Sequence, residues 1–307
     1  MSTSSELRRA HDPHRRLQEE IKALLRGNGA GYEEVARMVA NLPTGWELHG
    51  DLVLLPKDAF RSKEWQKVVG SELWGVVAGA LAVQRVARKG EISGDERRPD
   101  VEMLLGEDGW VTHREHGIDY SFDVTKSMFS AGNLGERGRI GELSCTGETV
   151  LDLYAGIGYY TLPLLIHAGA SHVHACEWSA DSLSALDYNL DANDVADRCT
   201  VHQGDNRAAL SDGGSAADAL GSCDRVMLGL LPSSEKGWPL ALAALKPEGG
   251  CLHLHGNAPG GEEEAWANSV VEQLSEMDNR RVLLEHLVKV KWYAPHVRHC
   301  VLDLRIG

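Results

Sequence analysis

The stretch VLDLYAGIGYYTLP, residues 150–163, has the pattern of a buried strand, a glycine-containing turn and the start of a helix. Gly156 and Gly158 allow the backbone to approach a ligand closely, with N–H groups at the helix start directed toward it. A dinucleotide fingerprint requires a small residue three positions after Gly158, where this chain has Thr161. A phosphate-binding P-loop requires a lysine, and none follows the turn. The turn therefore predicts a ligand site that differs from both pyrophosphate-binding patterns.

Short apolar strand patterns alternate with helical patterns from about residue 140 onward. The strand patterns lie at 149–154, 172–177, 200–204, 225–231 and 251–255. Strands and helices at this spacing are typical of right-handed βαβ units on a parallel sheet. The last two extended runs, 282–292 and 297–304, flank Pro295 and predict an antiparallel pair that ends the sheet. We therefore expect an α/β fold with a mostly parallel sheet.

The first part of the chain has a different pattern. A helical periodicity begins at Asp12 and Pro13, a typical N-cap and first-turn pair, and stops at the glycines of 27–29. Residues 63–89 look helical again. The extended runs that follow predict a small antiparallel sheet and lie at 101–105, 110–113 and 118–124. The expected domains are a helical extension over 1–40, a small α+β domain over 41–138 and the strand-and-helix domain over 139–307.

The composition excludes several classes of protein. The 307 residues are 43% hydrophobic and 25% charged, as in ordinary globular proteins. No apolar run approaches the roughly 20 residues of a membrane span, so no membrane partner is expected. The first 20 residues lack the apolar stretch of a secretory signal, and we expect a cytoplasmic chain that begins where synthesis begins. Six cysteines without a Cys-x-x-Cys pair predict reduced side chains, mostly in the core.

The formal net charge of −14 gives no general attraction to nucleic acid. An RNA partner would therefore require a local basic patch. One candidate patch lies at the N-terminus and one near the C-terminus: Arg8, Arg9, Arg15 and Arg16 in the first, and Lys289, Lys291 and Arg298 in the second. Solvated faces of a helix and a strand are an equally good interpretation of each group.

Polar side chains follow two of the predicted strands at the point where each strand ends. Glu177 is a single acid after an apolar strand, the position at which nucleoside-binding α/β folds bind a ribose diol; an N-cap role before Asp181 is the alternative. Asp205 and Asn206 follow the next strand and form a carboxylate–amide pair suited to a purine edge. Because parallel strands end at one edge of a sheet, these side chains predict one ligand crevice.

Two histidine pairs and Trp178 also have side chains that can bind ligands. His172 with His174 and His253 with His255 each place two imidazoles on one side of a strand. No third ligand is evident for either pair, so no metal site is predicted. Trp178 either stacks on a purine or packs between a helix and the sheet.

The motifs DLYAGIG at 152–158, CEW at 176–178 and GDN at 204–206 resemble, in this order, those of the class I S-adenosylmethionine-dependent transferases. Longer stretches are similar to the wybutosine-synthesizing aminocarboxypropyltransferases, which share a family with the tRNA guanosine-37 N1-methyltransferases. They are FDVTKSMFSAGN at 122–133, LGLLPSSEKGWP at 228–239 and YAPHVRHCVLDL at 293–304. The resemblance extends from about Leu42 to Leu304. It implies a Rossmann-like class I sheet with a smaller N-terminal α/β domain.

This resemblance implies transfer of the 3-amino-3-carboxypropyl group from S-adenosylmethionine to the tricyclic wybutosine precursor at position 37 of phenylalanine tRNA. It implies that Ser130 and Arg137 hold the amino-acid end of the cofactor, because an arginine matches a carboxylate well, and Arg139 is the alternative to Arg137. Glu177 would bind the ribose. The implied cofactor-binding residues are Ser130, Arg137, Asp152, Ala155, Gly156, Gly158, Glu177, Trp178, Asp205, Asn206 and Gly229. No catalytic residue is assigned.

The turn after the fourth predicted strand distinguishes two reactions. Methyltransferases that modify nitrogens carry Asn or Asp, Pro, Pro and an aromatic residue in this turn, and this chain carries Leu230-Leu231-Pro232-Ser233. The missing polar anchor favours attack by a carbon of the base on the methionine γ-carbon. A tRNA methyltransferase of the guanosine-37 N1 type is the alternative. The third hypothesis is an inactive RNA-binding or partner-binding module.

Overall fold

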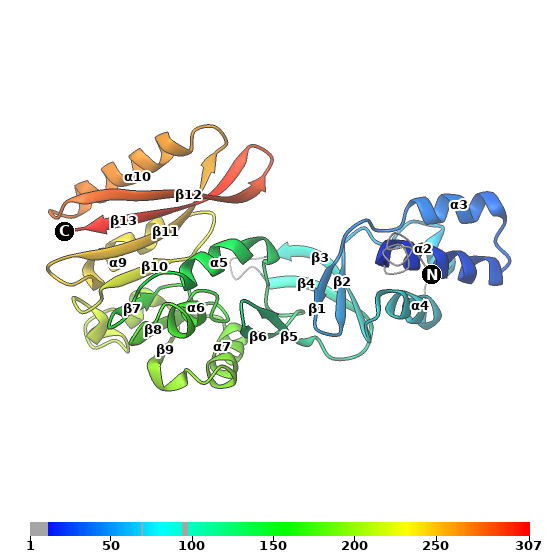
Figure 1. The fold of residues 1–307 in the computed structure, drawn as a ribbon, viewed down its shortest axis with the longest axis horizontal. Coiled ribbons are helices and arrows are strands. Elements are labelled where there is room, and N and C mark those ends of the chain that lie inside the picture. The colour runs from blue at the N-terminus through cyan, green and yellow to red at the C-terminus, as the bar shows by residue number, and fades with distance from the viewer. Residues whose placement is uncertain (1–11, 69, 94–97) are drawn as a thin grey trace, which may run out of the picture. The chain divides into compact units, whose positions relative to one another are not determined.

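The structure, a computed structural model, describes residues 12–68, 70–93 and 98–307. It divides into two units (Figure 1): one contains the chain up to His113 together with Ser121–Phe129, and the other contains Arg114–Tyr120 and Ser130–Gly307. The boundary expected between residues 138 and 139 falls inside helix α5, Leu134–Gly141, which belongs entirely to the second unit. The second unit takes the chain from Ser130 onward, so the main boundary lies before Ser130.

In the part of the first unit that the structure describes, three helices pack on a four-stranded sheet. The helices are α2 (Pro13–Gly27), α3 (Tyr32–Ala40) and α4 (Ser71–Leu81), and the strands, in spatial order, are β1 (Glu47–His49), β2 (Leu52–Leu55), β3 (Arg85–Ser93) and β4 (Arg98–Leu105). The predicted N-cap is confirmed, because the Asp12 side chain accepts a hydrogen bond from the His14 backbone N–H. Leu17 and Ile21 of α2 lie in the same apolar core as Val53 of β2, so residues 12–40 are not a separate extension.

Two expectations for this unit are wrong. Of the described residues in 63–89, only the 3-10 turn Trp65–Lys67 and α4 are helical. The helix α4 ends at Leu81, because Ala82 has a left-handed backbone conformation with φ +57° and the chain continues as β3. The expected small antiparallel sheet is divided: β4 pairs with β3 in a sheet that also contains the parallel pair β2–β3. The next two runs form a separate hairpin of β5 (Trp110–Glu115) and β6 (Ile118–Asp123).

The second unit contains a seven-stranded sheet whose spatial order is β12-β13-β11-β10-β7-β8-β9. The strands are β7 (Thr149–Asp152), β8 (His172–Glu177), β9 (Cys199–Gln203), β10 (Arg225–Leu228), β11 (Gly250–Pro259), β12 (Val282–Ala294) and β13 (Val297–Ile306). The first five are parallel, and β13 pairs antiparallel with both β11 and β12, which confirms the predicted end of the sheet. Strand order reverses on either side of β7, and ligands of open α/β sheets bind where such a reversal occurs.

The helices of the second unit follow the alternation that the sequence predicts. They are α5, α6 (Thr161–Ile166), α7 (Ala180–Ala192), α8 (Asn206–Ala209), α9 (Trp238–Ala244) and α10 (Glu263–Met277). Asn193, directly after α7, binds the tip of the β5–β6 hairpin: its side-chain amide accepts from the Asp119 backbone N–H at 3.0 Å and donates to the Asp119 carbonyl at 2.8 Å. None of the helices in the described ranges is long and apolar enough to span a bilayer.

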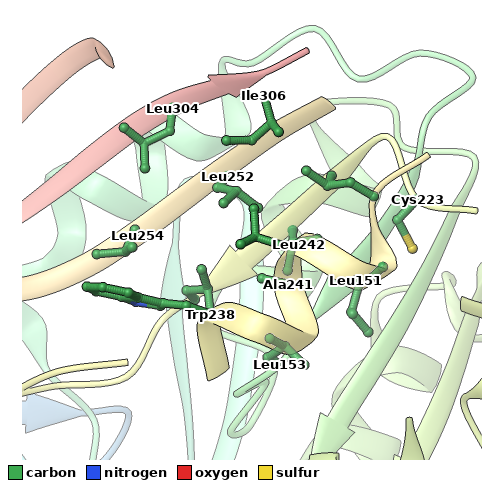
Figure 2. Packing of buried hydrophobic residues seen from close by; sticks show 14 of the residues in the cluster. Leu151, Leu153, Cys223, Trp238, Ala241, Leu242, Leu252, Leu254, Leu304 and Ile306 are labelled. Atoms are coloured by element: carbon green, nitrogen blue, oxygen red, sulfur yellow. The ribbon is translucent and has the colours of Figure 1, made fainter. Parts of the chain in front are cut away.

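The two faces of the sheet differ in chemistry. On one face Leu252 and Leu254 of β11 pack with Leu304 of β13 and with Trp238 and Leu242 of α9 (Figure 2). The alternating residues of the same strands, among them His253, His255 and Asp303, are polar and also buried. This period-two alternation places a buried polar surface on the side that α5 reaches through Arg139.

All six cysteines have free thiols, and five of them are buried. The expectation of reduced cysteines, mostly in the core, is confirmed.

Candidate functional site

The glycine turn connects the end of β7 to α6. Gly156 and Gly158 have φ values of +59° and +99°, which other residues adopt only with strain. A Cβ at Gly156 would lie 2.5 Å from the Tyr159 ring, and one at Gly158 would lie 3.0 Å from Leu162. The Ala155 N–H donates to the Cys176 carbonyl at 3.0 Å, which fixes the turn against β8. Glycine is therefore the residue that fits these two positions of the turn.

Asp152, the last residue of β7, holds this turn through hydrogen bonds. Its side chain is fully buried, accepts a hydrogen bond from the Thr161 hydroxyl at 2.8 Å, and accepts a longer one from the Tyr154 N–H at 3.3 Å. Burial raises the pKa of Asp152 to about 6, against the opposing effect of these hydrogen bonds. Thr161, the residue that departs from the dinucleotide fingerprint, is thus the partner that holds this carboxyl group in place.

Glu177 ends β8 and faces the glycine turn. One carboxylate oxygen accepts from the Gly156 N–H at 2.8 Å, and the other accepts from Trp178 at 3.0 Å and Ser179 at 2.8 Å. Burial raises the pKa of Glu177, and the three N–H groups oppose this shift. The alternative N-cap interpretation is wrong, because the residue that caps α7 is Ser179.

Trp178 is 55% exposed beside Glu177. A side chain with this exposure is not packed between a helix and the sheet, so that interpretation is wrong. The exposed indole is a flat apolar surface at the strand edge, suited to stacking on a planar ring.

Asp205 and Asn206 follow β9 at the same edge of the sheet. Asp205 caps α8 by accepting from the Arg207 N–H at 2.8 Å, and its ion pair with the Arg207 guanidinium lowers its pKa to about 2. Asp205 is therefore an acceptor at neutral pH. The Asn206 amide donates to the Leu153 carbonyl at 3.0 Å, which joins the end of β9 to the glycine turn.

Gly229 follows β10 and lies against Tyr160. A Cβ at Gly229 would lie 3.0 Å from the Tyr160 ring. Tyr160 also packs against His255 of β11, with ring centroids 4.8 Å apart. The turn with Leu230 and Leu231 thus begins beside Tyr160, the residue before α6.

Both candidate arginines of the preceding segment are matched by carboxylates of the chain itself. Arg137 is 2% exposed, forms a two-pronged ion pair with Glu115, and donates to the Ser130 carbonyl at 3.0 Å. Arg139 bonds both Glu136 and Asp303. A solvent-facing Arg137 is excluded by its burial. Of the two arginines, Arg137 is the one that contacts Ser130, and it does so through the backbone.

Sequence reasoning missed two residues that contact this segment from other strands. Lys291 of β12 donates to the Ser130 hydroxyl at 2.6 Å, and Glu115 of β5 binds Arg137. Lys291 was considered only as part of a basic patch, since nothing local to it indicates a contact with a residue 161 positions away. Glu115 is an acid at the end of a short strand, as Glu177 is, and this local pattern is a signal for a functional carboxylate.

The paired histidines have protein partners. His253 contacts Asp303 at 2.6 Å and Arg225 at 2.5 Å, His255 contacts His299 at 3.0 Å, and His174 contacts His202 at 3.0 Å. Within the described ranges no group of three or more His, Cys, Asp or Glu side chains is arranged to hold a metal ion.

The structure describes only part of the N-terminal basic patch, and the C-terminal patch lies close to an acid. Arg8 and Arg9 lie outside the described residues, and Arg15 is an exposed residue of α2 paired with Glu19. Lys289 and Arg298 both lie within 4 Å of Glu263, so part of the C-terminal patch is neutralised.

Comparisons with known proteins identify the family of the chain. The family model for the TRM5/TYW2 methyltransferase domain matches residues 111–285, and the model for the TYW2 N-terminal domain matches residues 33–109. The chain belongs to the TRM5/TYW2 family. Among its relatives, the human tRNA wybutosine-synthesizing protein 2 homolog is 42% identical, over 95% of this chain and 75% of the human protein.

Other members of the TRM5/TYW2 family extend the comparison. The tRNA wybutosine-synthesizing protein 2/3/4 of Arabidopsis thaliana is 43% identical over 96% of this chain, and the chain spans 29% of that longer protein. The crystal structure of Pyrococcus horikoshii TYW2 in complex with MeSAdo superimposes with a TM-score of 0.78 at 30% identity, covering 94% of this chain and 98% of that one. The α/β fold with a Rossmann-like class I sheet, expected from the resemblance, is confirmed.

Proposed function

We propose that the chain transfers the 3-amino-3-carboxypropyl group of S-adenosylmethionine to the tricyclic wybutosine precursor at position 37 of phenylalanine tRNA. The observation that carries the proposal is the edge of the sheet at which Glu177, Asp205 and the Gly156 turn meet. The chain is 30% identical to a TYW2 that was crystallised with MeSAdo, the nucleoside part of this donor. The match to the TYW2 N-terminal domain favours this reaction over guanosine-37 N1-methylation.

The residues at this edge fit the nucleoside. The Glu177 carboxylate is held rigidly by three N–H groups and retains lone pairs for the hydroxyl groups of a ribose diol. Asp205 is an acceptor suited to the exocyclic amine of adenine, and the exposed ring of Trp178 is suited to its face. Asp152, Ala155, Gly158, Asn206 and Gly229 shape the turn and bring the backbone close. Ser130, positioned by Arg137, would hold the amino-acid end.

The sulfonium of S-adenosylmethionine supplies a leaving group, so positioning is the main task of the protein. In the reaction the bond between the γ-carbon and sulfur breaks, a bond to a carbon of the base forms, and that carbon loses its proton to solvent. Leu230 and Leu231 occupy the turn where nitrogen-modifying enzymes place a polar anchor. Leu230 is 36% exposed and offers an apolar contact for a tricyclic base. No side chain is assigned as a general base.

Two labelled donors distinguish the candidate reactions. S-adenosylmethionine labelled either in the carboxylate or in the methyl carbon is incubated with the protein and tRNA from cells that lack the late steps of wybutosine synthesis. We expect the carboxylate label to enter the tRNA. Methyl label alone would establish a methyltransferase, and incorporation of neither label would contradict the proposed activity.

A further inference from the structure

The hairpin of β12 and β13 extends beyond the parallel strands at one edge of the sheet. β10 pairs with β11 as far as Leu228 and Leu254. β11 pairs with β13 further, up to Pro259 and Val297, so the end of β11 lies roughly 17 Å past the end of β10. Because β10 runs parallel to β7 and β8, this is the edge of the sheet that Glu177 occupies. The hairpin tip, residues 292–298, therefore projects from the edge that carries the candidate nucleoside site.

Trp292 in this hairpin tip is backed by a cation. It lies directly opposite Arg298 on the neighbouring strand, and the guanidinium carbon is 3.7 Å from the centroid of the indole ring. This distance is well within the range of a cation–π interaction. Arg298 Nε also lies 3.7 Å from a carboxylate oxygen of Glu263, which is buried at the start of α10. The guanidinium is thus held between this acid and the indole.

The loop after β11 fixes the edge of the same indole. A Cβ at Gly260 would lie 2.7 Å from the Trp292 ring, so the ring lies close against the backbone of this loop. The Gly260 N–H donates to the His296 carbonyl at 2.8 Å, which joins the loop to the turn of the hairpin. Despite these contacts Trp292 is 55% exposed. An indole that is held in place and still exposed over half its surface is suited to stacking on another flat ring.

The charges around the hairpin tip favour a nucleobase over a phosphate as the group that stacks or binds there. Lys289 and Arg298 both lie within 4 Å of Glu263, which partly neutralises them. The face of a nucleobase is uncharged, and stacking on an aromatic side chain requires no cation. Unpaired loops are the parts of an RNA whose bases are available for such stacking. The substrate of the proposed function is modified at a base in a loop of this kind.

We propose that Trp292, backed by Arg298, stacks on an unpaired nucleobase of the substrate tRNA that lies within a few nucleotides of the modified base. The proposal rests on the proposed function and adds an RNA contact outside the nucleoside site. In the sheet β12 lies three strands from β10, or roughly 14 Å, a distance that a few nucleotides of single strand can bridge. Trp292 is the binding residue, and Arg298 and Glu263 are positioning residues.

The test measures tRNA binding and its dependence on salt. The ligand is tRNA from cells that lack the late steps of wybutosine synthesis, and filter binding is carried out between about 50 and 200 mM salt. Trp292→Ala is expected to weaken binding about tenfold at every salt concentration, because one stacked base is lost. The slope of log affinity against log salt should not change, since stacking releases no counterions. Trp292→Phe should restore most of the affinity.

A control variant and a second ligand show whether the effect is specific. Leu283→Ala removes another exposed apolar side chain of β12, 40% exposed, at the end of the strand far from the hairpin tip, and it should leave tRNA binding unchanged. The affinity of Trp292→Ala for S-adenosylmethionine, measured by calorimetry, should stay within about twofold of that of the unaltered protein. Weaker binding of both ligands would mean a general loss of structure and would overturn the proposal.

The remaining outcomes separate stacking from other uses of this surface. Unchanged tRNA affinity in Trp292→Ala would overturn the proposal, and so would a Trp292→Phe variant as weak as Trp292→Ala. A salt slope shallower by about one would assign the hairpin tip to a phosphate, which also overturns it. Unchanged tRNA binding together with a smaller particle in sedimentation would assign Trp292 to a contact between copies of the chain. If the unaltered protein bound tRNA but transferred no label from either donor, the proposed function alone would fail; if it bound no tRNA, both proposals would.

Discussion

Glu177 has one role that its hydrogen bonds show and a second that belongs to the proposed function. It holds the turn through the Gly156 N–H, and in the proposed function it also binds the ribose. We expect Glu177→Ala to weaken S-adenosylmethionine binding by about 1.5–3 kcal/mol, the value of hydrogen bonds to a charged group. Calorimetry measures this loss, and Asp187→Ala, which removes an exposed acid of α7, is the control. An affinity unchanged by Glu177→Ala would remove Glu177 from the ribose site.

Asp152 makes stability depend on pH in an unusual direction for a carboxyl group. Its pKa is about 6 in the folded chain and about 3.9 when unfolded, so between these values the folded state binds more protons. The contribution of Asp152 to stability is therefore largest below pH 4 and falls by about 2–3 kcal/mol as the pH rises to 6.

Asp152→Asn should remove this dependence. The measurement is urea unfolding of both proteins between pH 4 and 7. We expect the stability of the unaltered protein, minus that of the variant, to decrease with rising pH and then level off above pH 6. A difference that is constant over this range would show that Asp152 has an ordinary pKa.

Residues whose signal is local could be found from the sequence. Glu177 is a single acid at the end of an apolar run, and Gly156 and Gly158 lie in a recognisable turn. Lys291 could not be assigned in this way, because its contact with Ser130 joins the last antiparallel pair to a segment before the first strand of the sheet. The pairing of Arg137 with Glu115 is equally nonlocal.

At the scale of elements, α5 is fastened to the sheet by charge. Arg139 of α5 bonds Asp303 of β13, which bonds His253 of β11, and His253 contacts Arg225 of β10. Burial raises the pKa of Asp303, but the bonds to His253 and Arg139 outweigh it and the net shift is downward. Removing one partner of a buried pair leaves uncompensated charge behind.

Asp303→Asn should therefore destabilise the protein by about 3 kcal/mol, measured by urea unfolding at pH 7. Glu285→Gln is the control, since Glu285 forms an exposed pair with Arg305 on the neighbouring strands and should contribute less than about 1 kcal/mol. Equal effects of the two substitutions would contradict a special role of Asp303.

The type of an element was predicted best where two signals agreed. The strands around Pro295 are rich in β-forming residues and interrupted by a residue that cannot continue a strand, and both strands are found where expected. The helix expected over 63–89 failed at Ala82, because a left-handed alanine ends α4 and the sequence offers no glycine there as a signal. The next strand, β3, contains the charged residues Arg85, Arg88, Lys89 and Glu91 and lacks clear alternation.

At the scale of the whole molecule, the negative net charge limits how RNA can be bound. With a formal charge of −14, only a few lysines and arginines can face phosphates, and two of the C-terminal candidates share Glu263. We expect the logarithm of tRNA affinity to fall with the logarithm of salt concentration with a slope of about −4 or shallower. Filter binding between about 50 and 200 mM salt measures it, and release of about ten or more counterions would contradict this expectation.

The change of fold class along the chain was visible in the sequence, since alternating strands and helices begin near residue 140. The position of the boundary was not visible, because the hairpin of β5 and β6 is divided between the two units. Local composition reports the ends of elements, whereas a unit boundary depends on which core each element joins.

The amide clamp of Asn193 on Asp119 has a consequence for recombination. The chain passes between the two units three times, after His113, Tyr120 and Phe129, because the clamped tip belongs with the second unit. A chimaera that exchanged one unit for that of a homologue would therefore need three matched junctions instead of one. Segments exchanged at a junction before or after the β5–β6 hairpin, with the hairpin kept intact, should give soluble hybrids. A single crossover inside residues 114–129 should give insoluble ones.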